Sequence, residues 1–345
     1  MDLQSLEGIE VKGRKVFVRC DFDVPIEDSK ILDDSRLVSA ISTIEYLLEN
    51  GAAVIAAGHL GRPNGVDPKL SLEIVAKWFA DEFPDSTLTK TKTEEFDSWS
   101  IKENFSVLEN LRFDPGEEEN SSEFTRKLAN LAHIYVNEAF GSSHRSHASI
   151  VGVPKLLPHF AGFHLLKEIK ILSGVLENPQ RPLTIIVGGA KIETKLPLVE
   201  KMHKFADSVL VGGEIAENTK EFAKVAHENI ADKKSTLLVA DLTSDGKDIA
   251  EQSTQSFIES IKNSKTIVWN GPMGEFENCF DQGTRDLAQA IAGSSAYTIV
   301  GGGDTIYFLQ KEGILDKFSF ASMGGGAMLE FLSGDKLPGL IALQN

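Results

Sequence analysis

The sequence predicts an α/β protein made of two doubly wound parallel-sheet, Rossmann-like domains joined by a bridging helix. Short apolar runs alternate with segments of helical period along the chain, as is typical of parallel strands covered by helices. The length of 345 residues exceeds what one hydrophobic core usually supports, so two domains are expected. The segments that follow the strands are cationic in the first half and glycine-rich in the second, which gives each domain its own chemistry.

In the first half, four apolar runs are predicted strands: Lys15–Arg19, 52–57, Phe105–Leu108 and 134–136. A helix is expected after the first strand, with Ser35 as its cap. Its apolar positions recur at helical spacing on one face, namely Leu37, Ile41, Ile44, Leu47 and Leu48. Gly51 ends this helix because glycine readily adopts the conformation of a helix terminus.

The second half repeats the pattern with six predicted strands: Leu183–Val187, Ser208–Val211, Thr236–Val239, 266–268, 296–300 and 318–322. Between the halves, residues 160–182 read as a bridging helix followed by a proline-bearing loop, with Leu165, Leu166, Ile169 and Leu172 at helical spacing. The domain junction is placed there. The two domains are therefore predicted to span residues 1–163 and 164–332.

Composition excludes several classes of protein. The formal charge of −16 and the pI of about 5.0 argue against a partner that is nucleic acid or a membrane surface. Two distant cysteines suit neither a disulfide framework nor a metal site, and the first residues carry no apolar signal region. A cytoplasmic location is expected. The acidic run 117–119 is predicted to be a solvated loop.

Ligands of open parallel sheets bind beyond the carboxyl ends of the strands, so the segments at those ends are informative. In the first half they read VRCDFDVP (18–25), GHLGRP (58–63), LENLRFDPGE (108–117) and NEAFGSSHRSHAS (137–149). They supply His59, Arg62, Arg112 and Arg145, with His144 and His147 beside the last, and Arg36 opens the first helix. Any one arginine is most simply a surface ion pair. Four at equivalent strand ends predict a small, highly anionic substrate.

In the second half the corresponding segments read VGGAKIETK (187–195), VGGE (211–214), WNGPMGEFE (269–277), VGGGDT (300–305) and SMGGGA (322–327). Glycines between a strand and a helix let backbone N–H groups approach phosphate oxygens at the helix N-terminus. A single glycine pair could be only a tight turn, but five such loops indicate a nucleotide site. Neither the Walker A pattern nor G-x-G-x-x-G occurs, so the common P-loop and dinucleotide fingerprints are excluded.

Taken in order, the motifs DFDVP, HLGRP, ENLRF, AFGSSHRSH, GGAK, WNGPMGEFE, GGGDT and GGGA resemble those of phosphoglycerate kinase. The resemblance implies an N-terminal domain for 3-phosphoglycerate or 1,3-bisphosphoglycerate and a C-terminal domain for Mg²⁺ with ATP or ADP. It further implies that a tail, residues 333–345, returns to the N-terminal domain, and that the enzyme is a monomer acting in glycolysis and gluconeogenesis.

The resemblance also implies roles for individual residues. The acid substrate would be held by Asp21, Phe22, Asp23, Arg36, His59, Leu60, Gly61, Arg62, Arg112 and Arg145. The nucleotide would be held by Gly189, Lys191, Lys195, Asn270, Pro272, Glu277, Gly302, Gly303, Asp304 and Thr305, with Asp304 near the Mg²⁺ that the phosphates carry. The transferring group would be stabilised by Arg36, Lys195, Gly302 and Gly325 on domain closure.

Three positions depart from the family pattern. Asp23 stands where the family carries Asn, Met323 where it usually has Thr, and Glu214 replaces a glycine. These departures leave open a second function, a nucleotide- or phosphometabolite-binding protein with weakened catalysis on the same scaffold. A dehydrogenase also fits the α/β pattern, but the chain lacks that fold's glycine fingerprint.

Overall fold

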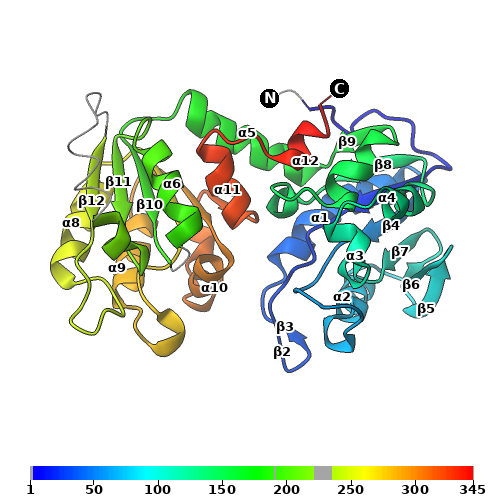
Figure 1. The fold of residues 1–345 in the computed structure, drawn as a ribbon, viewed down its shortest axis with the longest axis horizontal. Helices are drawn as coiled ribbons and strands as arrows, with labels where there is room; N and C mark the ends of the chain where they lie inside the picture. Colours follow the sequence, from blue (N-terminus) through cyan, green and yellow to red (C-terminus); the bar gives the residue numbers. More distant parts are fainter. Residues whose placement is uncertain (1–2, 190–191, 221–234, 345) are drawn as a thin grey trace. The chain divides into compact units, whose positions relative to one another are not determined.

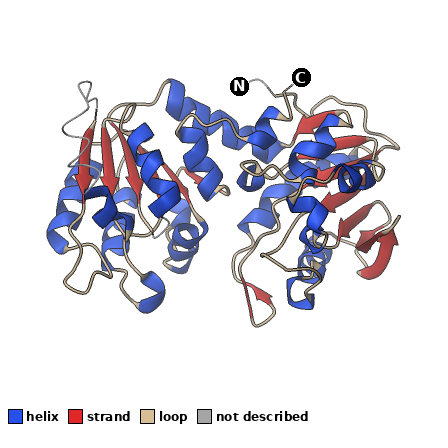
Figure 2. Ribbon diagram, viewed as in Figure 1, coloured by secondary structure: helices blue, strands red, loops and turns tan. Residues whose placement is uncertain are grey.

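The computed structural model describes residues 3–189, 192–220 and 235–344, with the side chains of residues 192–196 outside the description. The chain divides into two compact units, Met1–Lys170 together with Lys336–Asn345, and Ile171–Asp335. Figure 1 traces the element order and Figure 2 shows that strands and helices make up both units. Within the described ranges no helix is long and apolar enough to cross a membrane.

The first unit is built on a seven-stranded sheet in the order β5-β6-β7-β4-β1-β8-β9. Its strands are β1 (Lys15–Arg19), β4 (Ala53–Ala57), β5 (Thr89–Thr93), β6 (Phe96–Lys102), β7 (Phe105–Leu108), β8 (Ile134–Asn137) and β9 (His159–Ala161). A small hairpin pairs β2 (Ile26–Glu27) with β3 (Lys30–Ile31). The helices are α1 (Ser35–Glu49), α2 (Glu73–Glu82), α3 (Pro115–Glu118), α4 (Ser122–Ala129), the first part of α5 (Phe163–Glu177) and α12 (Pro338–Ile341).

The alternation of side chains along β1 separates the two faces of this sheet. Val16 and Val18 join a core cluster that also contains Leu37 and Ile44 of α1 and Phe79 of α2. The intervening residues of β1 point to the opposite face, where Phe17 stacks on Tyr135 at 6.0 Å between ring centroids. Arg19 continues this second face and is fully buried, an uncommon position for a charged side chain.

The second unit is built on a six-stranded parallel sheet in the order β12-β11-β10-β13-β14-β15. The strands are β10 (Leu183–Val187), β11 (Ser208–Val211), β12 (Thr236–Val239), β13 (Thr266–Asn270), β14 (Tyr297–Gly301) and β15 (Phe320–Ser322). Its helices are α6 (Ile192–Met202), α8 (Glu251–Lys262), α9 (Gln282–Ala292), α10 (Gly303–Lys311) and α11 (Gly325–Leu332). Trp269 of β13 belongs to one core cluster together with Phe257 of α8, Leu287 of α9 and Phe308 of α10.

The division between the units lies inside α5, after Lys170, whereas the sequence placed the junction at residue 163. The C-terminal segment assigned to the first unit begins at Lys336 rather than at residue 333. This segment is fastened by a hydrogen bond from the Gly339 N–H to the Ser143 carbonyl at 2.8 Å. A Cβ on Gly339 would stand 2.8 Å from Ile150 Cγ2, so the tail packs closely on the loop that follows β8.

The first sheet is mixed rather than wholly parallel, because β5 and β6 pair antiparallel at one edge. The sequence pattern predicted neither strand. β5 reads TKTKT and is exposed along almost its whole length, so it carries no apolar signal. The predicted cap of α1 was also one residue late, since Ser35 is the first helical residue and Asp34 precedes it. The buried face of α1 includes Ala40 and Thr43 rather than Ile41.

Candidate functional site

Both sheets have a topological switch point, which is a place where the connections from two neighbouring central strands run toward opposite edges of the sheet. In the first unit, β1 lies between β4 and β8. In the second, β10 lies between β11 and β13. Because a crevice for ligands opens beyond the carboxyl ends of the strands at such points, the residues following β1, β4 and β8, and those following β10 and β13, form the candidate sites.

Arg36 lies beside two carboxylates in the first unit. Its Nη1 is 3.9 Å from Asp21 Oδ1 and 3.8 Å from Asp23 Oδ2, and it also donates to the Asp23 carbonyl. The position follows from the fold, because Arg36 is in the first turn of α1 and both aspartates follow β1. The guanidinium therefore offsets the charge of two acids next to the predicted anion site.

The loop after β4 is tied to this pair of aspartates. The Gly61 N–H donates to Asp23 Oδ1 at 2.8 Å, and Arg112 Nη1 donates to the Gly61 carbonyl at 2.7 Å. Gly61 has a φ of +64°, a conformation that favours glycine, and a Cβ there would stand 2.8 Å from Leu70. His59 Nε2 is 3.9 Å from Asp23 Oδ2. The structure thus brings five predicted site residues together: Asp21, Asp23, Arg36, His59 and Arg112.

The histidines of this cluster are held neutral. Burial lowers the pKa of His59 well below its usual range, and the charges of Arg19 and Arg112 lower it further. Burial and Arg145 lower the pKa of His144 to about 4, and burial with Arg112 lowers that of His147 to about 3. Surrounding cations disfavour the protonated ring. An excess of arginine charge of this kind is the environment that an anionic ligand requires.

Four other predicted substrate residues differ in exposure. Phe22 and Leu60 are buried in the core, so only their backbone groups can reach a ligand. Arg62 and Arg145 have exposed side chains. Within the part of the chain that the structure describes, neither guanidinium pairs with a carboxylate, so both remain available to an anion.

Arg19, Ser149 and Glu117 form a hydrogen-bonded chain beside His59 that the sequence motifs did not predict. Arg19 Nε donates to Ser149 Oγ at 2.8 Å, and Ser149 Oγ donates to Glu117 Oε1 at 2.6 Å. The prediction of a solvated acidic run at 117–119 was wrong for Glu117, which is fully buried because its carboxylate is hydrogen-bonded beside a buried arginine. An arginine at the end of the apolar strand KVFVR was the available signal.

In the second unit, three loops meet at the N-termini of α10 and α11. Asn270, at the end of β13, donates from Nδ2 to the Gly325 carbonyl at 2.9 Å. Gly302 precedes α10 with a φ of +98°. A Cβ on Gly325 would stand 2.6 Å from the Gly302 Cα. Two helix N-termini are thus brought close together, which favours the binding of phosphate groups.

The remaining glycine-rich loops are tied to the same strand ends. The Gly189 N–H donates to the Pro272 carbonyl at 2.8 Å, and a Cβ on Gly213 would stand 2.6 Å from the Gly189 nitrogen. Thr305 is buried, and its Oγ1 accepts a hydrogen bond from the Gly271 N–H at 3.0 Å. Thr305 therefore supports the loop after β13, and its hydroxyl is not turned toward solvent.

A cavity of about 160 Å³ opens beside these loops. Four predicted nucleotide-site residues line it, namely Gly189, Pro272, Glu277 and Asp304, and Lys247 is the cation among the lining residues. Glu214 and Glu275 also line it. In the described ranges no three carboxylate, histidine or cysteine side chains could together hold a metal ion. The donor set therefore suits a divalent cation only if phosphate oxygens provide most of its ligands.

The side chains of two predicted phosphate-binding lysines are not among those that the structure describes. Lys191 lies outside the described residues, and Lys195 lies early in α6 with its side chain outside the description. Gly303 begins α10 and is exposed.

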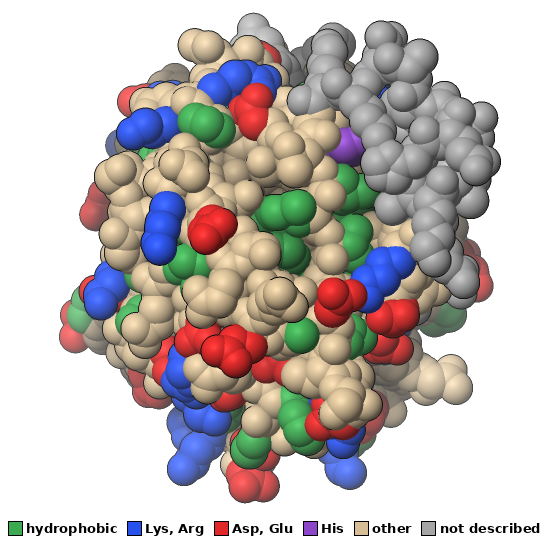
Figure 3. Space-filling view, turned by 90° about the vertical axis from the view of Figure 1, so that its left-hand side faces the viewer, with side chains coloured by type: hydrophobic (Ala, Val, Ile, Leu, Met, Phe, Trp, Pro, Cys, Tyr) green, Lys and Arg blue, Asp and Glu red, His purple; other side chains and the backbone are tan. Residues whose placement is uncertain are grey.

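On the side of the molecule shown in Figure 3, acidic and basic side chains are interspersed.

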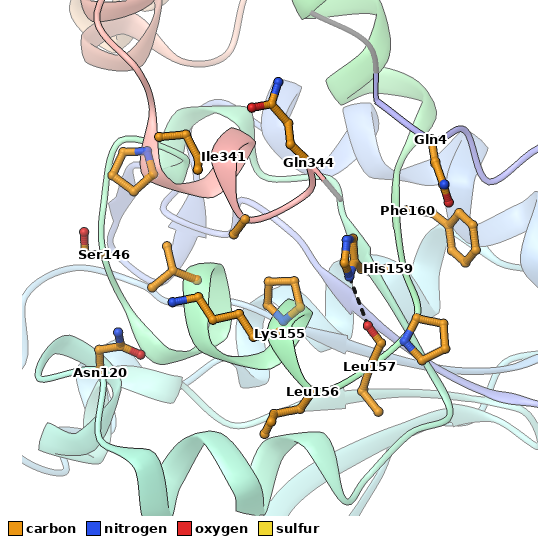
Figure 4. Close-up of a pocket in the computed structure, with 15 residues that line it drawn as sticks. Gln4, Asn120, Ser146, Lys155, Leu156, Leu157, His159, Phe160, Ile341 and Gln344 are labelled. Carbon is orange, nitrogen blue, oxygen red and sulfur yellow. Dashed lines mark hydrogen bonds between the residues drawn. The ribbon is translucent and has the colours of Figure 1, made fainter.

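A larger hollow of about 910 Å³ lies elsewhere in the first unit, between the C-terminal segment and residues 153–160 (Figure 4). Lys155, His159, Ile341 and Gln344 are among the residues around it. It contains none of the residues predicted to bind substrate or nucleotide. Size therefore does not identify the site in this protein, whereas the strand ends and their charges do.

Comparison with known proteins gives one consistent result. The family model for phosphoglycerate kinase matches residues 6–236 and 218–335. The phosphoglycerate kinase of Finegoldia magna is 39% identical over 390 aligned positions, covering 99% of this chain and 98% of the relative. That of Leptospira biflexa is 37% identical over 391 positions, covering 99% and 98%. These aligned lengths exceed the 345 residues of the chain, so both relatives carry residues that it lacks.

Solved structures agree with the sequence matches. The phosphoglycerate kinase from Coxiella burnetii aligns with a TM-score of 0.80 and 33% identity, covering 99% of each chain. That from Pyrococcus horikoshii aligns with a TM-score of 0.83 and 30% identity, covering 99% of this chain and 98% of that one. The whole described fold, rather than one unit of it, is therefore shared.

Proposed function

Because the chain belongs to the phosphoglycerate kinase family, we propose that its first unit binds 3-phosphoglycerate and its second unit binds the nucleotide. The family makes it a kinase that transfers a phosphoryl group reversibly between ATP and 3-phosphoglycerate. The observation that carries the assignment of ligands is the contrast between the sites. Arg36, His59 and Arg112 surround two aspartates in one unit, and adjoining helix N-termini meet in the other.

The reaction forms a bond between a carboxylate oxygen of 3-phosphoglycerate and the γ-phosphorus of ATP. It breaks the bond from that phosphorus to the β–γ bridging oxygen, so the products are 1,3-bisphosphoglycerate and ADP. The attacking carboxylate has no proton to lose, and a general base is therefore unnecessary. Catalysis rests on positioning and charge neutralisation, with direct transfer and no phosphoenzyme.

In this proposal the arginines hold the acid substrate and orient its carboxylate. Arg36 and Lys195 are the cations that we assign to the transferring group. The backbone N–H groups at the starts of α10 and α11 donate hydrogen bonds to the phosphate oxygens and stabilise their negative charge, because the N–H dipoles are already oriented toward it. Asn270 holds the α11 loop in place through the Gly325 carbonyl.

Bound Mg²⁺ would neutralise part of the phosphate charge of the nucleotide. Asp304, exposed in the first turn of α10, is the side chain that we assign to it. Glu277, in the same cavity, is assigned to the ribose. A monomeric, cytoplasmic enzyme completes the proposal, and the two free cysteines, Cys20 and Cys279, suit a reducing compartment.

A coupled assay with purified protein, Mg-ATP and 3-phosphoglycerate tests the reaction, and GTP in place of ATP tests the nucleotide preference. The assignment of the two units is tested by two variants in the same assay. Arg112→Ala should raise the KM for 3-phosphoglycerate alone, and Asp304→Asn should raise the KM for Mg-ATP alone. Absence of turnover would contradict the function, and interchanged KM effects would contradict the assignment of the units.

A further inference from the structure

Arg19 is the fully buried last residue of β1, and its side chain contacts three groups. Nη1 donates to the Cys20 carbonyl, Nε donates to Ser149 Oγ at 2.8 Å, and Nη2 lies 3.1 Å from His59 Nδ1. A guanidinium carries only donors and stays protonated in proteins. The contact between Arg19 and His59 therefore requires that His59 Nδ1 is the acceptor and carries no proton.

This requirement determines the state of the other ring nitrogen. A neutral imidazole has one N–H, so a ring whose Nδ1 accepts must carry its proton on Nε2. His59 Nε2 lies on the side of the acid-binding cluster, 3.9 Å from Asp23 Oδ2. The ring thus presents a hydrogen-bond donor to this cluster without adding a cation to it.

We propose that Arg19 is a positioning residue that holds His59 as the Nε2–H tautomer, so that His59 donates a hydrogen bond to an oxygen of the bound acid. The inference rests on the assignment of the first unit to 3-phosphoglycerate. Arg19 acts through His59 and is not itself placed against the substrate.

The orientation of Arg19 is determined in turn by Ser149 and Glu117. The Ser149 hydroxyl has one proton, which it donates to Glu117 Oε1 at 2.6 Å. Its oxygen is therefore free to accept from Arg19 Nε. The Ser149 N–H also donates to Glu117 Oε2 at 3.0 Å, which fixes the carboxylate at both oxygens. Glu117 in addition balances the buried charge of Arg19, which would otherwise be costly.

The alternative tautomer would not suit this site. With the proton on Nδ1, two N–H donors would face each other between Arg19 and His59. The lone pair on Nε2 would then point toward Asp23 and toward any carboxylate or phosphate oxygen bound there. Both arrangements place groups of like polarity together, so the site favours the Nε2–H form.

NMR of the intact wild-type protein tests the tautomer directly. Protein labelled with ¹⁵N-histidine would be examined at pH 7 by long-range ¹H–¹⁵N correlation, and the His59 signals identified by their loss in His59→Gln. We expect an unprotonated, pyridine-type Nδ1 and a protonated, pyrrole-type Nε2. A proton on Nδ1, or on both nitrogens, would overturn the proposal.

Two substitutions of His59 test the donor. The amide nitrogen of glutamine can take the place of Nε2, whereas that of asparagine lies nearer the place of Nδ1. His59→Gln should therefore keep the KM for 3-phosphoglycerate within about tenfold of wild type, and His59→Asn should raise it by on the order of 100-fold, the range for a lost hydrogen bond to a charged group. Equal losses would contradict a role for an Nε2 donor.

The role of Arg19 is tested by Arg19→Gln, with Tyr135→Phe as a matched control. Tyr135 is buried on the same face of the sheet, and within the described structure its hydroxyl has no hydrogen-bond partner. Arg19→Gln should raise the KM for 3-phosphoglycerate about 10- to 100-fold, leave the KM for ATP within about twofold, and produce a second tautomer of His59 by NMR. Tyr135→Phe should change none of these.

A purely structural role for Arg19 would change both KM values and leave the tautomer as in wild type, which would overturn the proposal. The tautomer is measured on resting protein and needs no turnover. An active enzyme whose His59 carries its proton on Nδ1 would therefore contradict this inference alone. An inactive protein with the Nε2–H form would contradict only the proposed function.

Discussion

Gly325 and Gly302 approach each other so closely that a Cβ on Gly325 would stand 2.6 Å from the Gly302 Cα. That distance is shorter than real Cβ contacts, and the obstructing atom belongs to the backbone. The two residues begin α11 and precede α10, so their contact sets the separation of the helix N-termini. Asn270 joins the same pair of loops through the Gly325 carbonyl.

Gly325→Ala should separate these N-termini and lower kcat by on the order of 10²-fold, because a displacement of about 1 Å can cost that much. Steady-state kinetics would measure it, with the KM for 3-phosphoglycerate expected to stay unchanged. Gly326→Ala is the matched control, since a Cβ at Gly326 meets nothing within 4 Å. Equal activity in the two variants would show that the close contact is unimportant.

Arg36→Ala should lower kcat by on the order of 10³- to 10⁵-fold, by analogy with arginines that stabilise phosphoryl transfer. The substitution removes the cation and leaves Asp21 and Asp23 without their common partner. Single-turnover kinetics would separate the chemical step from binding. Arg14→Ala, at an exposed position immediately before β1, should behave as wild type. Near-normal turnover in Arg36→Ala would exclude this role.

Asp23→Asn should lower the KM for 3-phosphoglycerate by up to about tenfold, because it removes a negative charge beside an anionic ligand. The asparagine oxygen can still accept from the Gly61 N–H, as Asp23 Oδ1 does at 2.8 Å. Asp23→Ala loses this hydrogen bond as well and should raise the KM. An unchanged or higher KM in the asparagine variant would show that the carboxylate does not impede binding.

Glu138→Gln should destabilise the start of α5 by about 1–3 kcal/mol, because the carboxylate accepts from three donors that an amide nitrogen cannot all satisfy. These donors are Thr43 Oγ1 at 2.5 Å, the His164 N–H at 3.1 Å and the Leu165 N–H at 3.0 Å. Hydrogen exchange of the His164 and Leu165 amides would report the loss. Glu177→Gln, exposed at the other end of α5, controls for the substitution. Unaltered exchange at both amides would count against this capping role.

The first unit should lose stability as pH falls from about 6.5 toward 3. His144 and His147 have folded-state pKa values of about 4 and about 3, below the ordinary 6.5. The unfolded chain therefore binds protons first, so the contribution is fully present above pH 6.5 and is lost on acidification through the folded values. The thermal midpoint measured between pH 7 and 4 checks this. His147→Gln should reduce the slope, and an unchanged slope in this variant would contradict the prediction.

The sequence predicted the elements whose residues are buried and apolar. Lys15–Arg19 and Leu183–Val187 were predicted with their observed bounds, because both are nearly continuous buried runs. Thr89–Thr93 was missed for the converse reason. An exposed edge strand has no side-chain pattern set by a core, and only its pairing with β6 makes it a strand.

Part of the candidate site could also be predicted from the sequence. Arg36, His59 and Arg112 were singled out because polar residues after strands meet at one edge of a sheet. Glu117 and Ser149 were not, because their role depends on a contact between segments 32 residues apart that neither segment reveals alone. Arg19 could be noticed in the sequence because it is a charged residue at the end of an apolar strand, but its role depends on its burial, which the sequence does not show.

Both edges of the first sheet are closed to further strands. At one edge β5 presents Lys90 and Lys92, whose ammonium groups would repel an identical strand brought alongside. At the other, the Ala161 N–H of β9 donates to the Gln4 carbonyl at 2.9 Å, and Ser5 forms a bridge to Ala161. Lysine charge at one edge and the N-terminal segment at the other thus disfavour the addition of a strand from another chain, the contact from which sheet-based aggregation starts.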